Sequence, residues 1–148
     1  MSESEDQKPI DPEADQAKRF ELVKAWMSRF ERCVRQKSYT LAPMIFHEAL
    51  VWMGVETNIC SSLKQAVEEE FKSFWPSTLG FTVDMSKAKI IPEGNFLLVI
   101  APWFAASQIQ GAPQKRGRLT LILGIFTGGK VLCLHGHQSI NPITRITA

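Results

Sequence analysis

Cysteine is scarce in this chain of 148 residues. The three cysteines, Cys33, Cys60 and Cys133, are an odd number. Such a set cannot form the paired framework on which small secreted domains rely, and it is typical of a reducing compartment. We therefore predict a cytoplasmic protein without a disulfide framework.

Long apolar runs are missing too. No run approaches the roughly 20 residues that a membrane span requires. The N-terminal residues are acidic and polar, whereas a signal peptide is basic and then apolar. We therefore expect no membrane partner.

Sequence motifs of well-known chemistry are not found either. The chain has no G-x-S-x-G elbow, phosphate-binding glycine loop, dinucleotide fingerprint or Cys-x-x-Cys pair. Its one basic cluster, residues 114–118, is short and is typical of a solvated loop before a strand. We therefore predict no cofactor and no nucleic-acid partner.

Charge divides the chain unevenly. Residues 1–15 hold six acids against Lys8, a net charge of −5, so residues 16–148 carry +7. The acidic stretch has no hydrophobic periodicity, and it cannot repay the entropy of ordering. We predict a disordered acidic tail over residues 1–15 and a single domain over residues 16–148, which is long enough to bury a core.

Hydrophobic periodicity predicts helices first. Steps of three and four predict a long helix over residues 15–36, capped by Asp15, and a shorter helix over residues 41–50. A short strand over residues 51–54 follows, and a third helix ends before Pro76. The apolar stripe of the first helix is Phe20, Val23, Met27, Phe30 and Val34, and that of the third is Leu63, Val67, Phe71 and Phe74.

Strands occupy the remainder. Residues 81–91 and 95–107 read as one pair, and residues 118–139 read as a hairpin about Gly128-Gly129. Three N-terminal helices followed by four strands predict an α+β fold, with the helices packed on one face of a curved antiparallel sheet.

The hairpin register separates two faces. A two-residue turn places Phe126 opposite Val131, Ile122 opposite His135 and Thr120 opposite His137. The predicted core face comprises Leu119, Leu121, Leu123, Ile125, Leu132 and Leu134. The other face mixes Arg118, Thr120, Ile122, Val131, Cys133, His135, His137 and Ser139, which suits a wet interface or a site. Cys133, His135 and His137 could share a metal, but no nearby acid completes or orients the set, so we predict no metal site.

At its end, Gly129 to Pro142, the chain resembles the SnoaL-like branch of the nuclear transport factor 2-like superfamily, which also contains ketosteroid isomerases and kinase association domains. The shared pattern is Gly and Lys, alternating apolar residues, then His135, His137 and Ser139. This sequence departs from it with Val131 in place of a usual tryptophan, and with Gly124 where many relatives have a polar residue. The resemblance implies a cone-shaped α+β barrel, commonly a homodimer through the outer sheet face, with an inner pocket.

Two sets of residues follow from these considerations. The predicted dimer interface consists of Ile122, Phe126, Val131, His135 and His137. The predicted pocket has Gln138 as its polar group, with Trp26, Phe30, Tyr39, Trp52, Trp103 and Phe104 as apolar walls. Our leading hypothesis is a homodimer that binds a small apolar or weakly polar molecule, with no assignable chemistry.

Two alternatives stay open. The first is an isomerase- or dehydratase-type enzyme acting on a carbonyl substrate, for which Asp84, His47 and His135 are the candidate acids and bases. The second is a catalytically silent association module that needs no cavity.

Overall fold

A computed structural model describes residues 12–56, 59–107 and 109–142. The first part contains α1 (Pro12–Gln36), a 3₁₀ helix (Tyr39–Met44), β1 (Phe46–Met53), α2 (Leu63–Ala66), a π-helical turn (Val67–Phe71) and α3 (Lys72–Phe74). The second part contains β2 (Thr78–Val83), β3 (Lys89–Glu93), β4 (Phe96–Ser107), β5 (Lys115–Ile125) and β6 (Val131–Ile140). Three 3₁₀ turns, Trp75–Ser77, Met85–Lys87 and Thr127–Gly129, precede β2, β3 and β6. Residues 1–11 of the predicted tail lie outside the described residues, whereas residues 12–15 already belong to α1.

The long first helix is confirmed. Val23, Met27, Phe30 and Val34 are all buried, as their spacing predicts. The helix ends at Gln36, and the φ of 53° at the next residue, Lys37, lets the N–H of Ser38 reach the carbonyl of Cys33 at 2.9 Å.

The predicted second helix is wrong. Residues 39–44 form a 3₁₀ helix around Pro43, and the chain then continues as β1. Pro43 has no N–H to sustain an α-helix, and pairing with β6 stabilises the extended alternative. The short strand predicted at residues 51–54 agrees with the structure, because residues 51–53 are the end of β1.

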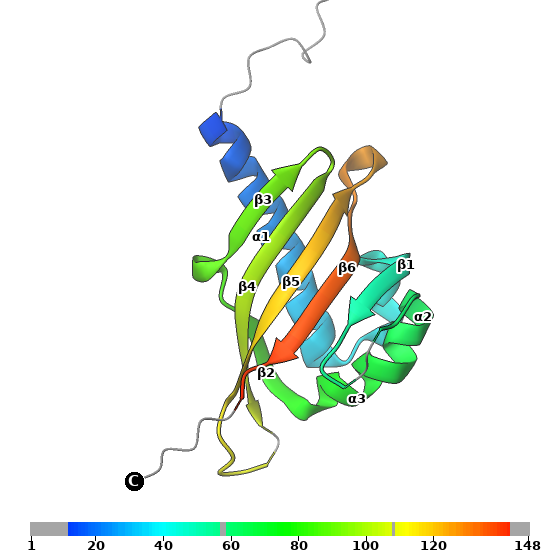
Figure 1. Cartoon of the computed structure of the whole chain (residues 1–148), viewed down its shortest axis with the longest axis vertical. Coiled ribbons are helices and arrows are strands. Elements are labelled where there is room, and N and C mark those ends of the chain that lie inside the picture. Colours follow the sequence, from blue (N-terminus) through cyan, green and yellow to red (C-terminus); the bar gives the residue numbers. More distant parts are fainter. Residues whose placement is uncertain (1–11, 57–58, 108, 143–148) are drawn as a thin grey trace, which may run out of the picture.

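The sheet has the order β1-β6-β5-β4-β2. β3 pairs with a part of β4 that does not pair with β2 (Figure 1). Every pair is antiparallel except β1 with β6, which is parallel. α1 crosses behind the curved, open sheet, and α2 and α3 lie beside β1 (Figure 1). The predicted α+β class is confirmed, although the sheet is mixed and does not close into a barrel.

The strand predicted at residues 81–91 is interrupted. Asp84 accepts a hydrogen bond from the N–H of Ser86 at 3.1 Å and caps the turn Met85–Lys87. This turn separates β2 from β3, so each pairs with a different part of β4.

A β-bulge divides the central hairpin. Ile122 faces His135 and Thr120 faces His137, as predicted, but Gly124 faces Leu132 and Ile125 faces Val131. The connection is a longer loop, closed by the N–H of Phe126 on the carbonyl of Lys130 at 2.7 Å, with positive φ at Gly128 and Gly129. The extra residue shifts the register of residues 131–134 by one.

Aromatic side chains dominate the space between α1 and the sheet. Phe30 contacts Trp26, Phe46, Trp52, Trp75 and Phe81, with ring centroids 5.2 to 6.4 Å apart.

Within the described part of the chain, no helix combines the length and the apolarity that crossing a membrane demands.

Candidate functional site

The candidate site is the outer face of the sheet, the face turned away from α1. Strand pairing aligns its side chains in rows that cross five strands. The first row is Ile91, Leu98, Ile122, His135 and Val51, and the second is Lys89, Ile100, Thr120, His137 and Met53. The first row contains no carboxylate, ammonium or guanidinium group. Its side chains form an apolar band in which the imidazole of His135 is the one polar group.

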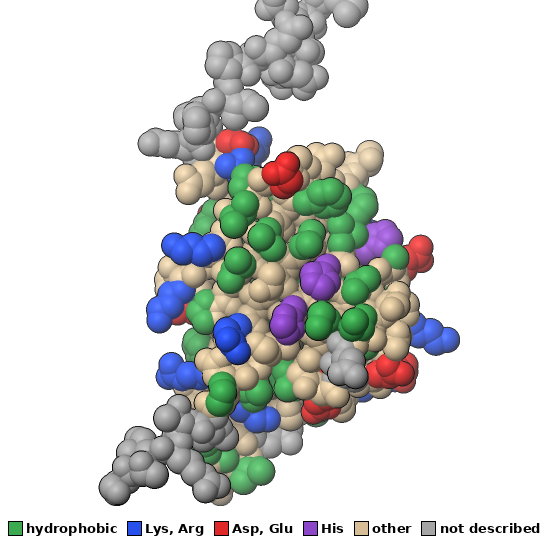
Figure 2. Space-filling view, in the orientation of Figure 1, with side chains coloured by type: hydrophobic (Ala, Val, Ile, Leu, Met, Phe, Trp, Pro, Cys, Tyr) green, Lys and Arg blue, Asp and Glu red, His purple; other side chains and the backbone are tan. Residues whose placement is uncertain are grey.

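The band is accessible to solvent in the protomer. Ile91 is 51% exposed, Ile100 42% and Val51 40%. Figure 2 shows hydrophobic and histidine side chains together over the strands, with charged groups mainly at the margin of the view. A contiguous exposed apolar surface with a polar rim is typical of an interaction site.

His135 is oriented by the neighbouring strand. Its Nδ1 lies 2.9 Å from the carbonyl oxygen of Val51. A carbonyl only accepts, so Nδ1 carries the proton and Nε2 is left for another partner. His137 lies two residues further along the same face and is exposed. The two imidazoles are therefore presented together on the outer face.

The predicted outer-face set needs two corrections at the bulge. Cys133 is fully buried, and burial raises the pKa of its thiol far above the usual value. Val131 packs against the core, whereas Leu134 and Phe126 cover Gly124 on the outer face. The bulge thus turns the thiol away from His135 and His137, and the three do not share a face. Among the described residues no cluster of three metal-ligating side chains occurs.

Four of the six residues predicted to wall a pocket lie in the core. Trp26, Phe30, Trp52 and Trp103 are almost fully buried, and Trp52 contacts both Phe30 and Phe46. Tyr39 is half-buried and stacks on Trp75 at 5.4 Å. Phe104 is exposed, because it alternates with Trp103 along β4.

Within the described ranges of the chain, three buried hydrogen-bond donors of this interior have no partner. They are Nε1 of Trp52, Nε1 of Trp75 and Nε2 of Gln138. Gln138 is buried, and it pairs with Leu119 in the sheet. Gly136 is the preceding inward-facing residue of β6, and the indole of Trp52 lies over it. An unpartnered buried donor costs roughly 1–3 kcal/mol, so three of them call for an acceptor.

The candidate acids and bases lie apart. Asp84 is occupied as a turn cap. His47, predicted at a helix end, lies in β1, where its Nδ1 accepts from the N–H of Ala49 at 3.0 Å and its ring stacks on Phe126. His135 is held by Val51. The structure brings no two of them together.

Solved structures of similar shape come from several bacteria. A nuclear transport factor 2-like superfamily protein from Salmonella enterica serovar Typhimurium matches with a TM-score of 0.71 and 14% identity over 88% of this chain and 96% of that one. A candidate ketosteroid isomerase from Shewanella frigidimarina matches at 0.66 with 13% identity, over 80% and 94%. A candidate association domain of calcium/calmodulin-dependent protein kinase II from Xanthomonas campestris matches at 0.64 with 14% identity, over 82% and 87%.

The chain has the nuclear transport factor 2-like fold. No family model matches the sequence, and no curated protein matches it either. The similar solved structures confirm the fold that the hairpin motif predicted, whereas membership of the superfamily and of its SnoaL-like branch stays a prediction.

Within this nuclear transport factor 2-like fold, sequence reasoning missed part of the outer face. Leu98 and Ile100 could have been found from the alternation along β4. Val51 and Met53 could not, because they reach the face only through parallel pairing with β6.

Glu70, a buried carboxylate that binds the N–H of Val55 at 2.7 Å, was also missed, because it lies beside the predicted apolar stripe.

Proposed function

We propose that this domain is a non-catalytic association module that forms a homodimer through its outer sheet face. The observation that carries the proposal is the first row, from Ile91 to Val51, which crosses five strands without a charged side chain. One protein of similar fold is named as an association domain, which agrees with this proposal. The cytoplasm, with its reduced thiols, is the proposed compartment, which agrees with the free thiols of Cys33 and Cys133.

Sedimentation velocity tests the proposal directly. We expect a dimer at tens of micromolar, because an apolar band of this kind gains free energy when a second copy removes it from water. A monomer at this concentration would overturn the proposal.

A second candidate function is the binding of a small, weakly polar molecule in the interior. The three unpartnered donors of Trp52, Trp75 and Gln138 favour it, because a carbonyl or hydroxyl oxygen could accept from them. The enzymatic alternative has no such support, because Asp84, His47 and His135 are separately engaged.

Gln138→Leu tests the second candidate. If a bound molecule accepts from the amide, the substitution should lower the free energy of unfolding by about 1 kcal/mol. Native mass spectrometry should also show a non-covalent mass on the wild type and less of it on the variant. Leu119→Met, at the paired position, is the matched control for a change of shape alone. A more stable variant and a wild type without added mass would contradict the idea.

A further inference from the structure

His135 and His137 form a pair of imidazoles on the outer face of β6. Residues two apart in a strand project from the same face, with Cα atoms about 6.5–7 Å apart. The residues that pair with them on β5 and β1 are Ile122, Thr120, Val51 and Met53. In a tetrahedral zinc site, bonds of about 2.0–2.1 Å put two ligand nitrogens roughly 3.3 Å apart. Two rings that start from these neighbouring positions and lean together reach this separation.

His135 already has the hydrogen bond that orients a metal ligand. Its Nδ1 lies 2.9 Å from the carbonyl oxygen of Val51, so Nδ1 carries the proton and Nε2 keeps its lone pair. Metal-binding histidines usually donate their other ring N–H to such an acceptor, which fixes the tautomer and the direction of the ring. The carbonyl belongs to β1, which pairs with β6 in the same sheet. The fold therefore prepares this nitrogen before any metal ion binds.

One chain supplies only half of a tetrahedral site. Structural zinc normally has four protein ligands, and among the described residues no third metal-ligating side chain joins the two imidazoles. Cys133, the nearest thiol in sequence, is buried on the other side of the sheet. The sequence prediction of no metal site considered one chain alone. A second copy related by two-fold symmetry brings the same pair of ligands again and completes the set of four.

We propose that His135 and His137 from two copies of the chain bind one zinc ion at the two-fold axis of the homodimer. This inference rests on the proposed association through the outer sheet face. Two sheets packed face to face lie about 10 Å apart, so imidazoles on facing strands meet in the layer between them. Imidazoles suit zinc, whereas magnesium and calcium prefer carboxylates. The filled d shell of zinc imposes no geometry, so the ion accepts the crossing angle that sheet packing sets.

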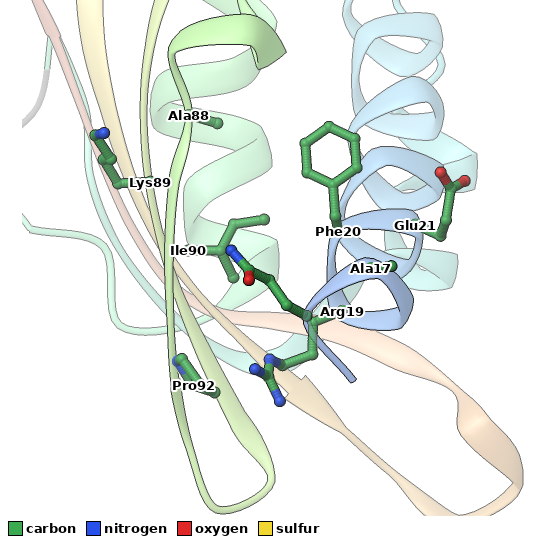
Figure 3. A pocket seen from close by; sticks show the side chains of 9 residues that line it. Ala17, Arg19, Phe20, Glu21, Ala88, Lys89, Ile90 and Pro92 are labelled. Carbon is green, nitrogen blue, oxygen red and sulfur yellow. The ribbon is translucent and has the colours of Figure 1, made fainter. Parts of the chain in front are cut away.

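Two cations in the rows of this face bear on the affinity for zinc. Figure 3 shows Lys89 pointing away from α1, whereas Ile90 points toward it. Three strand spacings, about 14 Å, separate Lys89 from His137, which exceeds the Debye length of about 8 Å. Arg118 is a diagonal neighbour of His137, at about 7–8 Å. Arg118→Gln should therefore tighten zinc binding about twofold to fivefold, because it removes a nearby like charge from each copy.

Sedimentation equilibrium of the full-length chain without an affinity tag, in zinc and in EDTA, tests the proposal. We expect the dissociation constant of the dimer to be at least about tenfold lower in zinc, because the ion binds only the associated form with four ligands. Titration against a chromophoric chelator should give one zinc ion per two chains, and cobalt should show the strong visible absorption of a tetrahedral site. His137→Gln, at an exposed position, should lose both metal signals and keep the dimer that is measured in EDTA.

Two matched variants should bind zinc as the wild type does. They are His47→Gln, at the third histidine of the chain, and Cys133→Ser, at the inward thiol. One zinc ion per chain without tighter association, or full binding by His137→Gln, would overturn the shared site. A dimer that is equally tight in zinc and in EDTA, with no bound ion, would overturn the zinc site and leave the proposed homodimer standing. A monomer in both buffers would overturn both.

Discussion

Replacing Ile122 by glutamate should convert the proposed dimer into a monomer. Ile122 lies at the centre of the first row, between Leu98 and His135. In a dimer the substitution would bury two carboxylates, one from each copy, at a cost of several kcal/mol. We expect the dissociation constant to rise at least about 100-fold, which corresponds to about 2.8 kcal/mol.

Met44→Glu is the matched control for this experiment. Met44 is a more exposed apolar side chain, and it lies on the 3₁₀ helix before β1, outside both rows. Sedimentation equilibrium of both variants should show a monomer for Ile122→Glu and an unchanged dimer for Met44→Glu. If Ile122→Glu stayed dimeric while folded by circular dichroism, the interface would have to lie elsewhere on the domain.

Removal of the Glu70 carboxylate should strongly destabilise the domain. Glu70 is 1% exposed and accepts from the N–H groups of Val55 and Glu56, at 2.7 and 3.1 Å. It belongs to the π-helical turn, and its side chain lies against Gly54, where a Cβ would be 2.1 Å from the carboxylate carbon. The carboxylate therefore holds the loop after β1 to the helical segment.

We expect Glu70→Ala to lower the free energy of unfolding by about 3 kcal/mol, because it leaves two backbone donors without this charged acceptor and opens a cavity. For a domain of this size the midpoint of thermal unfolding should fall by about 6–12 °C. The neighbouring Glu69→Ala, at an exposed carboxylate, should change stability by no more than about 0.5 kcal/mol. Equal midpoints for the two variants would show that the loop is held by other contacts.

Local patterns predicted much of this fold. The steps of three and four in α1 identified Val23, Met27, Phe30 and Val34 as buried, because a helix turns by a constant angle per residue. Alternation along β5 likewise identified Leu119, Leu121 and Leu123 as core. Half of the hairpin register was also correct, and it placed His135 and His137 on the outer face.

The same reasoning failed where a single residue changed the register. One extra residue beside Cys133 turned its thiol inward, and it moved Val131 to the core. A bulge leaves no mark in alternation, because each residue around it remains apolar. The prediction that Cys133, His135 and His137 share one face was therefore wrong, because the backbone changes at a position that no residue spacing reveals.

By itself, the sequence determined the helix–sheet order, the apolar faces of α1 and β5, and the hairpin motif that resembles the nuclear transport factor 2-like superfamily. These properties depend on contacts between residues close in the chain. Only the tertiary structure decided that residues 46–53 form a strand, that Val51 orients His135 from 84 positions away, and that the aromatic side chains pack against one another. Such contacts depend on which distant segments meet, and the free energy of that pairing outweighs the weak local preferences of the residues involved.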